Sequence, residues 1–463
     1  MTSHPTRRAF LGSVALGVGS ALLQTGCATD AAAARDLRQV VGGRVLRPGD
    51  GEYDVAARPW NMSVAQQPAA VVELADSADA AAVVRYARDT AMTVTVQPNG
   101  HGASGNADSN TILVRTNRLN QIHIDPHLRT ARIGAGTAWG ELLGALQRHD
   151  LLATAGSTPA VNVIGYTLGG GLSWFSRKYG WTADHVLAID IIDHDGTPHR
   201  ITRNSDADLF WALRGGGGDF ALVTAIELEL TPAPTLYGGR LVWSINQARP
   251  VLDAYRLVTS RAPDELTVWY QLLQFPGRPP MVAIDATHLG APDQAGQLLR
   301  PFDQIAGRIS DTRRVLALDQ LGSITAEPTK PSSTRSHAEL LTHLDDGDTE
   351  ILIEPPEPLF NVQLRHLGGA LATRTDSATE PPTEEYLLTL SAVADAGPRT
   401  EDRIRRYRDA LHPQLSGRVP FTFLSPGDST TRAFSTDTLT KLREIKRRND
   451  PRNIFRSNFP VGI

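Results

Sequence analysis

A single histidine lies between two glycines directly after a run of β-branched residues. The segment Gly100-His101-Gly102-Ala103-Ser104 follows residues 93–96, Thr-Val-Thr-Val, and a second glycine-rich run occupies residues 165–171. Glycine lets the main chain approach a ligand and donate N–H groups to it, because no Cβ stands in the way. The two runs therefore predict a backbone that lies against a large flat cofactor, with one imidazole within reach of it.

The first of these segments also matches the dinucleotide-binding fingerprint G-x-G-x-x-G, which ends here at Gly105. In that fingerprint a helix begins where the glycines end, so that its N-terminus receives the pyrophosphate. Residues 106–110, Asn-Ala-Asp-Ser-Asn, are instead typical of a turn, and we do not expect a dinucleotide-binding βαβ unit. An ordinary turn is the alternative for any one glycine motif, but Gly156 and the run at residues 215–218 favour a shared site.

Length and composition limit the class of protein. At 463 residues the chain is too long for one ordinary core, so we expect two domains or one elaborated domain. With 41% hydrophobic and 21% charged residues and a net charge of -4, it is typical of a globular protein with no preference for nucleic acid. Its single cysteine, Cys27, excludes internal disulfides and zinc sites built from cysteine. Asp193, His194 and Asp195 lie in a predicted hairpin turn, where we expect solvated surface and no metal site.

The N-terminal segment, residues 1–35, is predicted to be an export signal. Arg7 and Arg8 precede a mildly apolar run at residues 11–23, which resembles a twin-arginine signal. The run is too short for a membrane span, which needs about 20 apolar residues. The twin-arginine machinery exports folded proteins, which suits a protein that acquires a cofactor first. A secreted or cell-envelope location is therefore expected, with a lipid anchor at Cys27 and cleavage near residues 31–34 as alternatives.

Hydrophobic periodicity predicts a mixture of strands and helices. Residues 70–74 and 93–96 are predicted strands, and Asp76 caps a helix between them. Thr-Pro-Ala-Pro at residues 231–234 marks a predicted boundary. Residues 326–358, rich in Pro, Asp, Ser and Thr, are predicted to be a loop that forms a wall of a site. Further strands are predicted at residues 112–114, 122–124, 130–134, 186–192, 199–202, 220–230, 241–245, 266–273, 281–289 and 385–392, and helices at 139–149, 206–213 and 439–448.

Five segments together resemble the FAD-linked oxidases related to berberine bridge enzyme, which have the vanillyl-alcohol-oxidase or PCMH-type fold. They lie at residues 97–104, 130–136, 156–180, 209–219 and 442–458. The resemblance implies an α+β protein with a two-subdomain FAD-binding domain and an α/β substrate-binding cap that contains an antiparallel sheet. The implied limits are 55–233 for the FAD-binding domain, 234–425 for the substrate-binding domain, and 426–463 for a C-terminal segment that returns to the FAD-binding domain.

The resemblance also assigns roles to the glycine-rich segments. His101 matches the histidine that bonds covalently to the 8α-methyl carbon of the flavin, which would hold FAD through export and raise its redox potential. Relatives with two covalent links have a cysteine where this chain has Thr158, so attachment through His101 only is implied. Asp219 and Ala221 replace the usual Asn and Gly. The residues expected to bind FAD are Gly100, His101, Gly102, Ala103, Gly156, Ser157, Thr158, Gly165, Gly169, Gly170, Val223 and Asn458.

The proton acceptor departs from the family pattern. Many bacterial members have a tyrosine in a Tyr-x-Asn-Phe element, but residues 420–423 here are Pro-Phe-Thr-Phe and carry no ionisable group. Tyr270 and Tyr386, each in a predicted strand of the cap, are the expected catalytic residues, because a strand tyrosine can lose its proton when a nearby charge lowers its pKa. Glu354 and His366 are further candidates, and an ordinary packing role is the alternative for all four.

The expected function is that of a secreted FAD-dependent oxidase. It would transfer hydride from an alcohol, sugar or secondary-metabolite C–H to flavin N5 and pass the electrons to dioxygen, giving hydrogen peroxide. Two alternatives stay open, namely a dehydrogenase that uses a different acceptor and a flavin-binding protein with little turnover. The expected partners are a small-molecule substrate, dioxygen and the twin-arginine export machinery.

Overall fold

The computed structural model describes residues 36–373, 375–394 and 397–462, so the predicted export signal and Cys27 lie outside the described residues. From Asp36 onward the chain forms one compact unit. Within these ranges no helix is both long and apolar enough to cross a membrane.

A four-stranded sheet, ordered β1-β2-β4-β3, carries the loop that contains His101. Strands β2, β4 and β3 are parallel, and β1 is antiparallel to β2. Helix α3 joins β2 to β3 and begins at Asp76, whose carboxylate accepts hydrogen bonds from the N–H groups of Ala78 and Asp79. The elements are α1 (Leu37–Val40), β1 (Arg44–Leu46), α2 (Tyr53–Ala57), β2 (Ala70–Glu73), α3 (Ser77–Thr90), β3 (Thr93–Val96) and β4 (Thr111–Arg115).

A second, antiparallel sheet has the order β5-β6-β10-β8-β9. Helix α3 contacts β3 of the first sheet and β8 and β10 of the second, so both sheets share one hydrophobic core. The elements are β5 (Ile122–Asp125), β6 (Thr130–Gly134), α4 (Trp139–Gln147), β7 (Leu151–Leu152), α5 (Val163–Leu168), α6 (Ser176–Tyr179), β8 (Val186–Ile192), β9 (Pro198–Ile201), α7 (Ala207–Leu213), β10 (Leu222–Glu229) and β11 (Thr231–Pro232), which pairs with β7.

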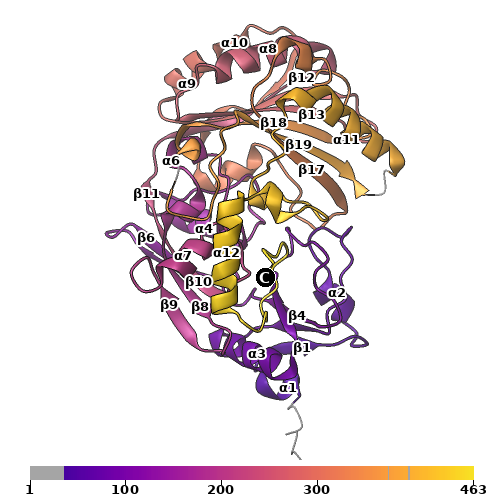
Figure 1. Cartoon of the computed structure of the whole chain (residues 1–463). Coiled ribbons are helices and arrows are strands. Elements are labelled where there is room, and N and C mark those ends of the chain that lie inside the picture. Colours follow the sequence, from indigo (N-terminus) through magenta and orange to yellow (C-terminus); the bar gives the residue numbers. More distant parts are fainter. Residues whose placement is uncertain (1–35, 374, 395–396, 463) are drawn as a thin grey trace, which may run out of the picture. The chain divides into compact units, whose positions relative to one another are not determined.

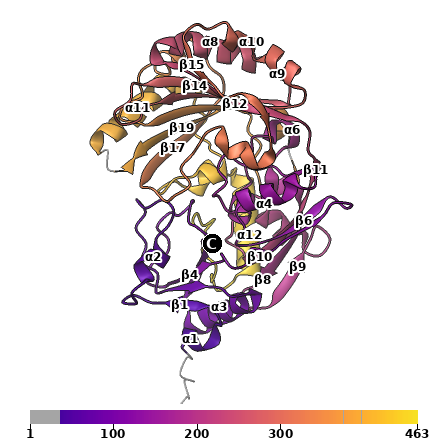
Figure 2. The ribbon, with the colours of Figure 1, turned by 180° about the vertical axis from the view of Figure 1, so that it is seen from behind.

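The third sheet is also antiparallel, has eight strands in the order β15-β12-β14-β13-β18-β19-β17 with β16 beside β12, and forms a cap with its helices. Helices α8, α9, α10 and α11 lie on its far side from the other two sheets (Figures 1 and 2). The elements are β12 (Leu236–Ser244), α8 (Ala248–Thr259), β13 (Leu266–Leu273), β14 (Met281–Leu289), α9 (Pro292–Leu298), α10 (Arg300–Asp303), β15 (Arg308–Asp311), β16 (Arg314–Leu316), β17 (Thr334–Leu341), β18 (Asn361–His366), β19 (Tyr386–Val393) and α11 (Pro398–Leu411).

The two faces of the cap sheet differ in chemistry. Successive residues of a strand point to opposite faces. In β13, Tyr270 belongs to the core shared with helices α8 and α11, whereas its neighbour Trp269 packs with the core of the first two sheets. The face toward those sheets is rich in polar side chains, including Arg240, Asp285 and Arg365. Charged side chains are therefore present on the face toward the first two sheets.

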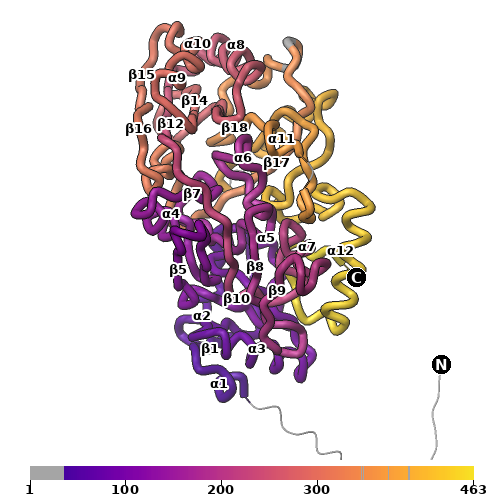
Figure 3. The backbone as a smooth tube through the Cα atoms, turned by 90° about the vertical axis from the view of Figure 1, so that its left-hand side faces the viewer, coloured from indigo at the N-terminus to yellow at the C-terminus, as the bar shows by residue number. Residues whose placement is uncertain are grey.

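The C-terminal residues return to the first sheet. Helix α12 (Thr436–Asn449) lies beside α7 (Figure 3). Phe455 forms a β-bridge with Val94 of β3. Lys446 anchors this return from a fully buried position, where its ammonium donates to the Asp450 carboxylate at 2.7 Å and to the carbonyls of Asp219 and Phe455 at 2.7 and 2.6 Å.

The mixed α and β architecture with antiparallel sheets confirms the predicted fold class. The predicted loop at residues 326–358 was wrong in one respect, because it contains strand β17. This strand lies at the sheet edge and exists through its pairing with β19, a tertiary contact that the Pro-rich composition concealed. The predicted limits of the domains stay predictions.

Candidate active site

A cavity of about 1380 Å³ lies between the glycine-rich loops and the polar face of the cap sheet. A pocket for one small ligand usually measures about 300–1,000 Å³, so this cavity has room for a large cofactor and a substrate together. The segment from Gly100 to Ala103 lines it, as do the other residues expected to bind FAD, Gly156, Ser157, Thr158, Gly165, Gly169, Val223 and Asn458. Gly170 is not part of this lining. A Cβ there would meet Thr379 and Trp181 at 3.0 and 3.2 Å, so Gly170 serves packing.

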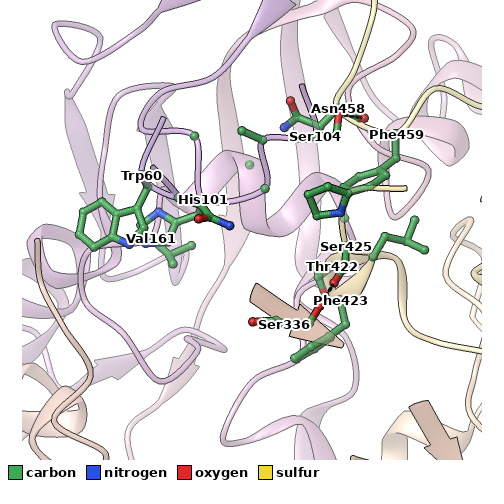
Figure 4. Close-up of a pocket in the computed structure, with 18 of the residues that line it drawn as sticks. Trp60, His101, Ser104, Val161, Ser336, Thr422, Phe423, Ser425, Asn458 and Phe459 are labelled. Carbon is green, nitrogen blue, oxygen red and sulfur yellow. Dashed lines mark hydrogen bonds between the residues drawn. The ribbon is translucent and has the colours of Figure 1, made fainter. Parts of the chain in front are cut away.

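His101 is held at the cavity wall by its own turn and by Trp60. Gly100, with φ of 76°, turns the chain after β3, and a Cβ on it would approach Pro59 to 2.9 Å. The imidazole of His101 stacks on the indole of Trp60, with ring centroids 4.0 Å apart and planes inclined by 20° (Figure 4). Burial lowers the pKa of His101 to about 4, so its ring is neutral at pH 7. Its Nδ1 is buried and has no hydrogen-bond partner among the described residues.

These loops fit the flavin cofactor that the sequence implies. His101 is neutral and lines the large cavity, and its buried Nδ1 has no hydrogen-bond partner among the described residues. A Cβ on Gly102 would meet nothing closer than Asn458 Nδ2 at 3.7 Å, and one on Gly165 nothing closer than Asn162 Oδ1 at 3.6 Å. A Cβ would therefore fit at both positions without a clash, so the glycines leave room for a ligand on the cavity side of the main chain. Asn162 fixes the second loop by capping α5, since its Oδ1 accepts from the N–H of Gly165 at 2.8 Å.

The C-terminal tail forms part of the same wall. Asn458 accepts from Gln97 Nε2 at 2.8 Å through its side chain, and its carbonyl accepts from the hydroxyl of Ser104 (Figure 4). Asp219, which replaces the usual Asn, is buried and accepts from the N–H groups of Ser457 at 2.9 Å and Val461 at 3.1 Å. A carboxylate suits this position because it provides two acceptors and no donor. Asp219 thus positions Asn458 through the main chain.

The cap contributes Arg365, Thr389 and Ser391 to the lining, from strands β18 and β19. The guanidinium of Arg365 lies 4.0 Å from the ring centroid of Trp269 and 5.1 Å from that of Phe423. Its Nε donates to Gln363 Oε1 at 2.6 Å. Burial lowers the pKa of Arg365, and the negative charge of Glu327 opposes that shift. Arg365 was not singled out from the sequence, because neighbouring strand residues give no sign of which of them faces the cavity.

Comparison with known proteins agrees with this geometry. Residues 68–202 match the FAD binding domain model. The (R)-6-hydroxynicotine oxidase of Paenarthrobacter nicotinovorans is 24% identical over 91% of this chain and 97% of its own length. The crystal structure of 6-hydroxy-D-nicotine oxidase from Arthrobacter nicotinovorans superposes with a TM-score of 0.79 at 24% identity, covering 90% of this chain and 97% of that one. The structure of a single-site variant of berberine bridge enzyme gives 0.77 at 19% identity, covering 92% and 99%.

The chain is an FAD-linked oxidoreductase with the fold of berberine bridge enzyme. Among the residues described for this oxidoreductase, no cluster of His, Cys, Asp or Glu side chains is arranged to hold a metal ion.

The two tyrosines expected to act in the oxidoreductase do not line the cavity. Tyr270 is fully buried on the helix side of the cap sheet, where its hydroxyl donates to the carbonyl of Leu352 at 2.7 Å. Tyr386 lies on that same side and shares a hydrogen bond of 3.0 Å with the hydroxyl of Thr259. Burial raises the pKa of both hydroxyls, which keeps them protonated. Side chains alternate between the two faces of a strand, and both tyrosines occupy positions that point to the helix side of the sheet. Neither placement supports the role of proton acceptor.

The other two candidates also lie outside the cavity of the oxidoreductase. Glu354 forms salt bridges with Arg403 and Arg406, at 2.8 and 3.1 Å. His366 is buried with its Nε2 3.2 Å from a guanidinium nitrogen of Arg177. Of the ionisable groups that do line the cavity, Tyr166 has its pKa raised by burial and stays protonated.

Glu327, like Arg365, is an ionisable residue of the cavity lining that was not singled out from the sequence. It is half-buried, lines the cavity, and forms no salt bridge in the part of the chain that the structure describes. It lies in residues 326–358, the stretch predicted to form a wall of the site, but its acidic side chain was not distinguished there from its Pro-rich and Thr-rich surroundings. A free carboxylate at the cavity is able to accept a proton.

Proposed function

We propose that this protein is an FAD-dependent oxidase that holds its flavin through one covalent bond to His101 and oxidises an alcohol, sugar or similar C–H bond in the cavity. The observation that supports it most directly is the neutral imidazole of His101, a residue of the cavity lining whose buried Nδ1 has no hydrogen-bond partner among the described residues. Bound FAD would supply hydride acceptance at the substrate carbon and return of the electrons to dioxygen, giving hydrogen peroxide.

The protein's own residues would provide the attachment point, the proton acceptor and the surface on which the flavin lies. His101 would provide the attachment point, and Thr158, which lines the cavity where some relatives have cysteine, leaves no second one. Glu327 would accept the proton of the substrate hydroxyl as the C–H bond is oxidised. The loops around Gly102 and Gly165, with no side chain between main chain and cavity, would let the flavin lie directly on the backbone.

The attachment is tested by acid precipitation of the purified holoprotein. We expect a yellow pellet from the wild type and a colourless one from His101→Ala, because acid releases flavin that is held without a bond. His123→Ala, which alters an exposed histidine on β5, is the matched control and should stay yellow. A colourless wild-type pellet from protein that was yellow in solution would refute covalent attachment while leaving FAD binding intact.

The oxidase activity is tested separately by reducing the flavin with substrate in the absence of air. Admission of air should restore the yellow colour within seconds and produce hydrogen peroxide in equal amount to the substrate oxidised. Slow reoxidation by air, together with fast reoxidation by a quinone, would identify a dehydrogenase instead. Absence of bleaching by every compound in a broad substrate panel would support the other alternative, a flavin-binding protein with little turnover.

The proposal includes export by the twin-arginine route, supported by Arg7 and Arg8 before a mildly apolar run. Replacement of both arginines by lysine should leave folded, flavin-containing protein inside the cell. N-terminal sequencing of the exported protein would show cleavage near residues 31–34 or a lipid-modified Cys27. Export that continues unchanged in the double lysine variant would exclude this route.

A further inference from the structure

Arg365 is an arginine of the cavity lining that forms no salt bridge with the described residues, although the negative charge of Glu327 acts on it. It comes from strand β18, is partly buried, and faces the cavity between Trp269 and Phe423. Its Nε is bonded to Gln363, and no hydrogen bond from its two Nη nitrogens is present in the described parts of the chain. A positive charge removed from water is costly unless an anion compensates it, and stacking on aromatic rings compensates only a part.

Another arginine on the same face of the sheet has its charge compensated by a salt bridge. Arg240 of β12 binds Asp285 of β14 through two parallel bonds, from Nε at 2.6 Å and from Nη2 at 2.7 Å. Two further arginines that line the cavity are also paired, Arg335 with Glu401 and Arg408 with Glu339. Arg365 therefore differs from these three arginines, because it has neither a salt bridge nor a hydrogen bond from its Nη nitrogens among the described residues.

A guanidinium with two free nitrogens matches the two oxygens of a carboxylate in geometry and in charge. The aromatic rings on which it lies restrict its motion, so less conformational entropy is lost when an anion binds. The hydroxyl-bearing residues Thr389 and Ser391 of the adjacent strand β19 line the same wall and extend its hydrogen-bonding capacity.

We propose that the substrate carries a carboxylate group and that Arg365 binds it, so that the substrate class is hydroxy acids and acidic sugars. This inference rests on the proposed oxidase function, since it places the reacting alcohol and the carboxylate in one molecule. Glu327, whose charge acts on Arg365 without a salt bridge between them, would then face the hydroxyl end of the substrate and Arg365 its acid end.

The test compares acids with neutral compounds of the same shape. Benzoate against benzamide, and mandelate against mandelamide, are titrated into the wild-type holoprotein and followed by flavin difference spectra and by calorimetry. We expect each acid to bind about 10- to 100-fold more tightly than its amide, the range typical of a hydrogen bond to a charged group. Arg365→Gln should remove this preference, and Arg365→Lys, which keeps the charge but not the fork, should keep a part of it.

The matched control is Arg335→Gln, which removes an arginine that lines the same cavity but is already paired with Glu401. It should keep the preference for acids. Equal affinity of the wild type for acids and amides would overturn the proposal, as would an unchanged preference in Arg365→Gln. A lower flavin potential in Arg365→Gln with the acid preference intact would also overturn it, because the guanidinium would then serve the flavin. Calorimetry needs no turnover, so an acid preference without flavin bleaching would leave carboxylate binding supported while the oxidase function failed.

Discussion

The indole of Trp60 lies against the imidazole of His101, with ring centroids 4.0 Å apart and an angle of 20° between the planes. The stack restricts the orientation of the imidazole, whose Nδ1 has no hydrogen-bond partner among the described residues. Trp60 is therefore a positioning residue for the proposed covalent bond, because bond formation depends strongly on the placement of the attacking nitrogen.

Replacement of Trp60 by alanine should slow covalent attachment of flavin by up to about 100-fold, the effect typical of a misplaced reacting group. The measurement is the ratio of yellow colour in the acid pellet to that in the supernatant, followed over time after FAD is added to apoprotein. Trp60→Phe should retain most of the rate because it preserves a stacking ring. Trp211→Ala, an aromatic residue of α7 in contact with Lys441, is the control and should behave as wild type. An unaltered rate in Trp60→Ala would show that the turn alone positions His101.

Glu327→Gln should lower the turnover number by about 100- to 10,000-fold, the usual contribution of a positioned general base. The amide fills the same space, so flavin content and substrate affinity should change little. Stopped-flow measurement of flavin bleaching isolates the chemical step. Glu401→Gln, at the rim of the same cavity, should reduce the rate by less than about twofold, since exposed ion pairs contribute little. A normal rate of bleaching in Glu327→Gln would show that a group other than Glu327 accepts the proton.

Lys446→Met should destabilise the protein by about 3–5 kcal/mol, because it leaves the carboxylate of Asp450 buried without its cation. Asp450 also accepts from the N–H groups of Ile454 and Phe455, at 2.9 and 2.8 Å, and so fixes the chain just before Asn458. Urea unfolding measures the loss, and flavin content should fall with it. Lys441→Met, on an exposed part of the same helix, should cost less than about 1 kcal/mol. Equal losses in the two variants would contradict the anchoring role.

The apoprotein should lose stability as the pH falls from 7 to 5.5. Burial lowers the pKa of His101 to about 4 and that of His366 to about 3, whereas both return to about 6.5 in the unfolded chain. The unfolded state therefore binds more protons below pH 6.5, which costs about 1 kcal/mol for each histidine at pH 5.5. Thermal unfolding at a series of pH values measures the slope. His366→Gln should flatten it, and a slope equal to that of the wild type would show that His366 titrates normally when folded.

The glycine-rich loops and His101 were accessible from sequence because their signal is local. A turn that needs Gly100 and a helix capped by Asn162 are decided by residues close together in the chain. The strand faces of the cap were not accessible in this way. All eight residues of β13 are buried, so this strand does not show the alternation of polar and apolar residues that marks a half-exposed strand. Nothing in Trp269-Tyr270-Gln271 therefore indicates which side chain turns toward the cavity. Tyr270 was selected for its chemistry and lies on the opposite face.

Arg365 and Glu327 were missed for a related reason. Each is distinguished by forming no salt bridge among the described residues. Salt bridges depend on residues that are distant in sequence, so the sequence alone does not show which charges are left without one. Arg365 stands within Gln363-Leu364-Arg365-His366, where the histidine was chosen as a candidate because the segment resembles the family. In the folded protein His366 is buried beside Arg177, whereas its neighbour Arg365 lines the cavity.

The return of Asn458 to the loop around His101 sets the order of events during synthesis. Ribosomes release a protein from its N-terminus, so the first sheet and its histidine emerge long before the strand-like segment that must dock against Val94. Until Asn458 has left the ribosome, the part of the cavity wall that this residue provides is absent, and the proposed flavin site is incomplete. We therefore expect a chain truncated before Asn458 to bind flavin less tightly than the full chain, because Asn458 lines the cavity.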